Sequence, residues 1–100
     1  MAEEVKEKLL ETEEVRQRIA DLRKRVGEMA DYIKIEERRT RLAGLEEQQA
    51  GADFWNNQSK AREVIAATNA ERAYVVPYDS LLKAVEDASV MLELAEMEEG

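Results

Sequence analysis

Apolar residues recur along the first third of the chain at the spacing of a single helix face. Between residues 15 and 33 the steps alternate between four and three, which is the spacing of a heptad seam. The seam positions are Val15, Ile19, Leu22, Val26, Met29 and Ile33. Val5 and Leu9 extend the same face towards residue 1. The pattern predicts a first helix over residues 3–30 that packs along this face.

The apolar face loses its phase after this first helix. If the helix continued, its packed face would carry mostly polar residues, namely Glu36, Thr40, Ala43 and Glu47. The apolar residues lie instead at Ile35, Leu42 and Leu45. We therefore predict a turn over residues 31–34 and a second helix over residues 35–49.

Two residues fit the ends of this second helix. Asp31 precedes it, and an aspartate side chain accepts backbone hydrogen bonds well as an N-cap. Gly51 follows it, and glycine readily takes the left-handed conformation that ends many helices. We expect Asp31 to cap the beginning of the second helix and Gly51 to cap its end.

A third periodic segment covers residues 58–97. Its packed face carries mainly apolar residues at helical spacing: Ala61, Val64, Ile65, Thr68, Val75, Tyr78, Leu82, Val85, Ser89 and Leu92. Pro77 lies inside this segment, and proline lacks an amide hydrogen and clashes with the preceding helical turn. Because the apolar face continues past Pro77, we predict a kink in one long helix rather than a reversal of the chain.

The only tryptophan and the only phenylalanine are neighbours, Phe54 and Trp55, between the second and third helices. A tryptophan side chain buries a large apolar area, and its ring N–H needs a partner. We predict that one or both rings plug the end of a helical bundle. The alternative is an exposed contact point for a partner protein.

The length of the chain, 100 residues, is that of one domain. Three periodic segments separated by short turns predict an all-α fold. We expect an antiparallel three-helix bundle with a long third helix kinked at Pro77, forming a single domain over residues 1–100.

The formal net charge of −8 is concentrated in the second half of the chain. From residue 84 onwards there are six acidic side chains and no basic one. Such a surface repels phosphate backbones, so we expect that the chain does not bind nucleic acid directly. We expect its partner to be a basic protein. Glu96, Glu98 and Glu99 oppose the partial negative charge of a helix end, which suggests that the native polypeptide continues.

The sequence offers little catalytic chemistry. It contains no histidine and no cysteine, which removes the commonest general base, the thiol nucleophile and the usual transition-metal ligands. The glycines are isolated, and the carboxylate pairs fall on predicted solvent faces. We therefore expect no catalytic, cofactor or metal site, and the pattern identifies no partner-binding residue. No apolar run is long enough for a membrane span.

Two basic clusters occupy residues 23–25 and 38–41. Each has acidic residues three or four positions away, which is the spacing of ion pairs along one helix. We interpret both clusters as helix-surface charge, with a partner contact patch as the alternative.

Five segments taken together resemble the N-terminal domain of the bacterial peptide chain release factor 2 family. They are residues 19–22, 31–33, 36–42, 53–57 and 85–95. The most specific are the Phe54-Trp55-Asn56 turn and the Leu92-Glu93-Leu94-Ala95 run. Pro77 departs from the family pattern, and so do the first twelve residues.

The resemblance implies that the parent protein is a class I release factor of the cytoplasm. Such a factor binds the ribosome at UAA or UGA and triggers hydrolysis of peptidyl-tRNA. The family's codon-reading Ser-Pro-Phe element and its Gly-Gly-Gln element do not occur in these 100 residues. The chain would therefore be a monomeric, non-enzymatic docking domain near the ribosomal stalk base and the partner GTPase release factor.

Two other functional classes remain open at this point. The seam over residues 15–33 would also suit a free-standing coiled-coil adaptor or dimerisation module. A carboxylate enzyme or metal-binding protein is the third class. A tight dimer buried along Ile19, Leu22, Val26 and Met29 would favour the adaptor.

Overall fold

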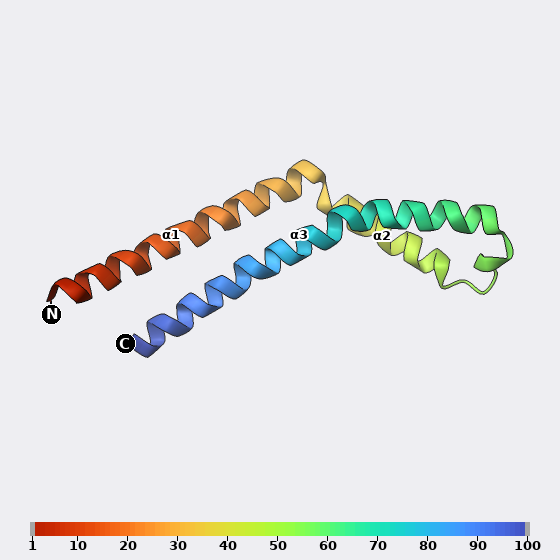
Figure 1. Ribbon diagram of the computed structural model, residues 1–100. Coiled ribbons are helices and arrows are strands. Elements are labelled where there is room, and N and C mark those ends of the chain that lie inside the picture. Colours follow the sequence, from red (N-terminus) through yellow and green to blue (C-terminus); the bar gives the residue numbers. More distant parts are fainter. Residues whose placement is uncertain (1, 100) are drawn as a thin grey trace. The chain divides into compact units, whose positions relative to one another are not determined.

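The computed structural model describes residues 2–99, excluding the side chains of Val5, Lys8, Leu9 and Glu99. The elements are α1 (Ala2–Ile33), α2 (Ile35–Gln49), the short 3₁₀ helix η1 (Phe54–Asn56) and α3 (Gln58–Glu99), as Figure 1 shows. The described residues contain no strand, so the predicted all-α class is confirmed.

The contacts within the chain define two compact units. Unit 1 combines Met1–Glu28 with Ser80–Gly100, and unit 2 is Met29–Asp79. Each of the two long helices therefore contributes one portion to each unit. A single three-helix bundle is not confirmed by this division.

Unit 1 pairs most of α1 with the second half of α3 (Figure 1). Arg16 forms an ion pair with Glu96, and the Arg23 guanidinium lies 3.1 Å from the Glu86 carboxylate. The earlier residue on α1 meets the later residue on α3, so the two helices run antiparallel. Val26 and Val85 are buried in this unit.

The seam predicted for α1 is only partly buried. Ile19 and Val26 are buried and Ile33 is half-buried. The alternate positions Val15, Leu22 and Met29 are 44%, 45% and 42% exposed. Only alternate positions of this face are therefore covered, whereas a complete heptad seam would bury both positions of each heptad. The predicted contributions of Val5 and Leu9 lie outside the described side chains.

The packed face of α3 follows the prediction closely. Its buried residues are Ala61, Val64, Thr68, Glu71, Val75, Tyr78 and Val85. The helix is continuous from Gln58 to Glu99 with Pro77 inside it, so a chain break at the proline is excluded. The apolar residues on both sides of Pro77 continue to pack, which offsets the hydrogen bond that proline cannot make. The kink itself stays a prediction.

Unit 2 packs α2 against the first half of α3, and α2 has the predicted bounds. Ile35 is buried, and Leu42 and Leu45 are half-buried. The Arg72 guanidinium lies 3.2 Å from the Glu46 carboxylate, which links the exposed edges of the two helices.

The predicted N-cap of α2 is wrong. Asp31 lies inside α1, which continues three residues beyond its predicted end to Ile33. The chain turns instead at Lys34, which has the left-handed conformation with φ 55° and ψ 54°. The Lys34 amide donates to the Asp31 carbonyl oxygen at 3.3 Å, and the Arg38 amide donates to the Lys34 carbonyl oxygen at 3.1 Å. These backbone bonds hold the turn without a side-chain cap.

The predicted glycine cap at the end of α2 is also wrong. The cap is Ala50, with right-handed φ −79° and ψ −12°, and Gly51 has no positive φ. The Gly51 amide donates to the Gln48 carbonyl oxygen at 3.2 Å. Tight turns of this kind satisfy the last carbonyl groups of the helix without a left-handed residue.

Candidate functional site

The aromatic corner, Phe54 and Trp55, lies in the turn between α2 and α3 and belongs to unit 2. Trp55 is 63% exposed and does not plug the end of a bundle, so of the two rings only Phe54 is placed for the predicted role. Phe54 is half-buried and packs edge-on against Trp55, with ring centroids 4.8 Å apart. The short 3₁₀ turn directs only one of two adjacent rings inwards. The exposed ring instead suits the alternative interpretation, a contact point.

Backbone and side-chain hydrogen bonds fix the aromatic corner. The Phe54 amide donates to the Gly51 carbonyl oxygen at 3.3 Å, and the Asn56 amide donates to that of Asp53 at 3.1 Å. The Asn57 side-chain oxygen accepts the Lys60 amide at 3.1 Å. Asn57 is therefore the N-cap of α3, a role that asparagine before a helix could have indicated from sequence. These hydrogen bonds stabilise the turn that carries the two rings.

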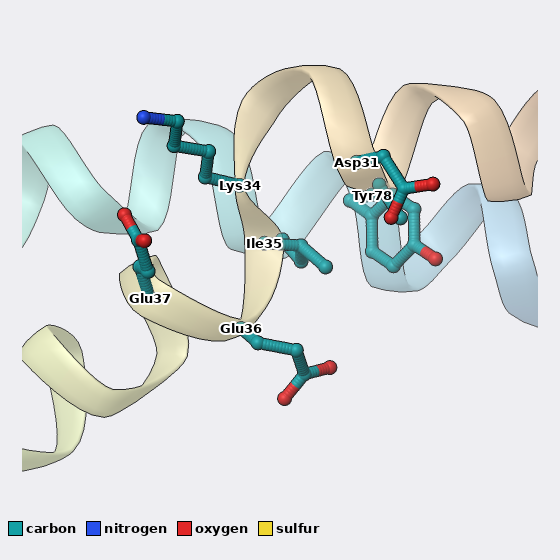
Figure 2. Close-up of a pocket in the computed structure, with 7 residues that line it drawn as sticks. Asp31, Lys34, Ile35, Glu36, Glu37 and Tyr78 are labelled. Carbon is teal, nitrogen blue, oxygen red and sulfur yellow. The ribbon is translucent and has the colours of Figure 1, made fainter.

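A shallow pocket of about 350 Å³ lies at the turn between α1 and α2, within unit 2 (Figure 2). Ile35 and Tyr78 are its buried apolar members. The carboxylates of Asp31, Glu36 and Glu37 and the ammonium group of Lys34 surround it. All four of these charged residues are exposed.

The charged residues around this pocket offer a weak electrostatic attraction. Exposed carboxylates attract a cationic side chain weakly, because water screens them. Among the described residues, no group of three His, Cys, Asp or Glu side chains could hold a metal ion.

Glu71 is the buried charge that the sequence interpretation missed. It is 6% exposed and accepts hydrogen bonds from Arg38 at 3.3 Å and from Arg41 at 2.8 Å. Arg38 also donates from Nε to the Ile33 carbonyl oxygen at 2.7 Å, and its guanidinium stacks 3.6 Å from the Tyr74 ring centroid. Arg38 thereby ties the end of α1 and α2 to α3. The spacing of Glu71 from Thr68 and Val75 on the packed face was the available signal.

The third arginine of this cluster, Arg39, also contacts α3. It donates to Asp79 at 3.1 Å, and this hydrogen bond raises the pKa of the Arg39 guanidinium above its ordinary value. The cluster at residues 38–41 therefore joins helices, which corrects its interpretation as ordinary helix-surface charge. In the other cluster, Arg25 pairs with Asp21 along α1 as expected, at 3.0 Å, whereas Arg23 pairs with Glu86 across the helices.

Known proteins resemble this chain over most of its length. It is 34% identical to peptide chain release factor 2 of an Exiguobacterium species over 89 residues, which are 89% of this chain and 24% of that protein. It is 35% identical to the factor of Acidithiobacillus ferrooxidans over 85 residues, 85% of this chain and 23% of that protein. The Staphylococcus epidermidis factor is 29% identical over 89 residues, again 89% and 24% of the two chains.

The chain thus corresponds to part of a class I peptide chain release factor. The relatives named here are each a peptide chain release factor 2, which confirms the resemblance stated from the sequence. The chain spans about a quarter of the length of these curated relatives. No family model and no solved structure matches it. Within residues 2–99, no helix has the length and apolarity needed to cross a bilayer.

Proposed function

We propose that this chain is the N-terminal docking domain of a class I peptide chain release factor. The full-length factor would direct termination at UAA and UGA codons in the cytoplasm. The observation that supports this most strongly is the similarity to release factor 2 proteins over 85–89% of the chain. Residues 2–99 form helices and no strand, and such a helical surface suits a docking role.

The proposed docking partner is the ribosome near its stalk base, together with the partner GTPase release factor. A net charge of −8 favours contact with basic proteins and steers their approach. The same charge argues against a direct grip on ribosomal RNA. We propose that the chain acts as a monomer and that hydrolysis belongs to other parts of the factor.

The aromatic corner is the surface that best suits this docking contact. Exposed tryptophans in fixed turns commonly dominate binding energies, because little side-chain freedom is lost on association. Trp55 meets both conditions, since it is 63% exposed and its turn is held by hydrogen bonds.

A binding measurement tests this proposal. The chain contains no cysteine, so one introduced at exposed Ala2 carries a single fluorophore. Titration with 70S ribosomes should raise the fluorescence anisotropy, and full-length release factor 2 should reverse the rise. Trp55→Ala should weaken binding about tenfold or more, whereas the control Tyr32→Ala, at a residue 88% exposed, should not. Binding that the full-length factor does not displace would contradict the docking role.

We also propose two features of the fold. The three helices form one domain over residues 1–100, and α3 bends locally at Pro77. Residual dipolar couplings of amides on the two sides of Pro77 measure this bend. A straight helix through the proline would contradict it.

The coiled-coil adaptor has less structural support. It requires the seam of α1 to face another chain, and Ile19 and Val26 are already buried within unit 1. A dimer using that seam would first have to separate α1 from α3.

A further inference from the structure

The pocket at the turn between α1 and α2 contains a hydroxyl group that has no hydrogen-bond partner. Tyr78 lines this pocket and is only 8% exposed. The Arg39 guanidinium lies over its ring, 5.7 Å from the centroid, but no residue between 2 and 99 forms a hydrogen bond with the Tyr78 hydroxyl. Polar groups on buried side chains are normally paired, because an unpaired one costs free energy. The unpaired hydroxyl therefore points to a ligand.

The Tyr78 hydroxyl can be reached from the pocket. Within residues 2–99, every fully enclosed side-chain nitrogen or oxygen has a hydrogen-bond partner. The unpaired Tyr78 oxygen must therefore keep some contact with solvent, and the pocket that Tyr78 lines provides it. Figure 2 shows the Ile35 side chain pointing towards Tyr78, so the pocket combines a buried aliphatic surface with a free hydroxyl group.

The charges around this hydroxyl favour a cationic ligand over an anionic one. Three carboxylates and one ammonium group line the pocket, those of Asp31, Glu36, Glu37 and Lys34. Asp31 and Glu37 have no ion-pair partner among the described residues. Figure 2 shows the Lys34 side chain extending away from Tyr78 and Asp31. An anion at the hydroxyl would therefore be repelled by unpaired carboxylates, whereas a cation would be attracted.

Arg39, the cation of the chain that lies over the Tyr78 ring, is already paired. It donates a hydrogen bond to Asp79 at 3.1 Å, and its Nε lies 3.9 Å from the Glu36 carboxylate. The Asp79 carboxylate balances its charge, and Arg39 does not reach Asp31. The pocket thus keeps an unpaired carboxylate and an unpaired hydroxyl, which are two acceptors for a cationic donor.

We propose that this pocket binds an arginine side chain of a basic partner protein. The aliphatic part of the arginine packs on Ile35, and its guanidinium donates to the Asp31 carboxylate and to the Tyr78 hydroxyl oxygen. Arginine suits the pocket better than lysine, because a guanidinium has five N–H donors and is less strongly hydrated than an ammonium group. This binding is separate from the aromatic corner and does not depend on a role in termination.

An NMR titration of the purified, isotopically labelled chain tests the proposal. The probe is N-acetyl-arginine amide, and the control is N-acetyl-citrulline amide, which has nearly the same shape but no charge. The signals to follow are the Ile35 methyl groups and the backbone amides of Lys34 and Glu36. We expect saturable shifts with the arginine probe, with a dissociation constant of about 1–10 mM, and no saturation with the citrulline control.

Two tyrosines of α3 provide a matched pair of variants. Tyr78→Phe removes only the hydroxyl, so we expect binding of the arginine probe to weaken about tenfold. Because this hydroxyl has no partner in the folded chain, the urea midpoint of Tyr78→Phe should be unchanged or raised. Tyr74→Phe removes a hydroxyl from a residue that is 46% exposed and lies outside the pocket. It should leave the dissociation constant within about twofold.

A second pair of variants separates the pocket from the overall negative charge. Asp31→Asn should weaken binding of the arginine probe about fivefold or more, because it removes the carboxylate that receives the guanidinium. Glu47→Gln removes the same charge at an exposed position of α2 outside the pocket. It should change the dissociation constant by no more than about twofold, because water screens exposed charges.

Three results would overturn the proposal. Equal shifts with the arginine and citrulline probes would show that the pocket does not recognise a cation. Binding that Tyr78→Phe leaves unchanged would show that the unpaired hydroxyl is not part of the site. Equal losses in Asp31→Asn and Glu47→Gln would assign the binding to the general negative charge of the chain. None of these results would affect the docking role of the aromatic corner, since the titration contains no ribosome.

Discussion

At the scale of single residues, the polar side chains of unit 2 are organised around the packed face of α3. Thr68 is 1% exposed, accepts a hydrogen bond from Gln49 at 2.7 Å and donates to the Val64 carbonyl oxygen at 2.7 Å. Glu71, at the next position of this face, accepts hydrogen bonds from Arg38 and Arg41. Buried polar groups persist only when they are paired in this way, because an unpaired one costs free energy. These residues thus specify how α2 lies on α3 as well as stabilising the contact.

Replacing Glu71 should reveal this dependence. We expect Glu71→Gln to lower the free energy of unfolding by about 2 kcal/mol, because two arginines lose their counter-charge while both keep partial access to water. Urea denaturation measures the change. The matched control is Glu63→Gln, at an exposed position on the same helix, which should stay within about 0.5 kcal/mol. Equal effects of the two substitutions would refute the role assigned to Glu71.

Removing the smaller ring of the aromatic corner should destabilise the protein more than removing the larger one. Trp55 is the larger side chain but is 63% exposed, whereas Phe54 is half-buried. We expect Trp55→Ala to cost less than about 1 kcal/mol of unfolding free energy and Phe54→Ala to cost about 2 kcal/mol. Urea denaturation of both variants checks the order, and a greater cost for Trp55→Ala would contradict the observed burial.

At the scale of elements, the turn between α1 and α2 depends on one residue in an unfavourable conformation. Lys34 is the single non-glycine residue with positive φ in the described chain. The left-handed region costs a residue with a Cβ atom about 1–2 kcal/mol. The cost is tolerated because Ile35 is thereby placed where it is buried.

Glycine at this position should therefore stabilise the protein. We expect Lys34→Gly to raise the free energy of unfolding by about 0.5–1 kcal/mol, since relief of the left-handed strain exceeds the entropy that glycine adds to the unfolded chain. The control Lys83→Gly, in the interior of α3, should lower it by about 1 kcal/mol. Chemical denaturation distinguishes the two signs, and destabilisation by both substitutions would show that the Lys34 turn carries no strain.

At the scale of the whole molecule, apolar spacing predicted the helices but not the junctions between them. The face from Ala61 to Leu92 was read correctly because a helix buried on one side must repeat its apolar residues with the helical period. The Lys34 turn had no comparable signal, because lysine has no preference for the left-handed conformation. The prediction left open whether Phe54 or Trp55 is the buried ring, because size and apolarity do not reveal which of two adjacent rings a short turn directs inwards.

The contacts between the two long helices show the same limit. The pairs between Arg23 and Glu86 and between Arg16 and Glu96 show which edge of α1 lies beside α3. Such cross-helix pairs join residues more than sixty positions apart, and no local pattern predicts them.

The central claim, that this chain works as part of a class I release factor, is tested most directly by a chimera. Residues 1–100 replace the matching quarter of a bacterial release factor 2, and peptide release is measured on purified ribosomes stalled at UGA. We expect release well above that of a factor lacking the matching quarter altogether. A folded chimera that releases no more peptide than the truncated factor would contradict the claim.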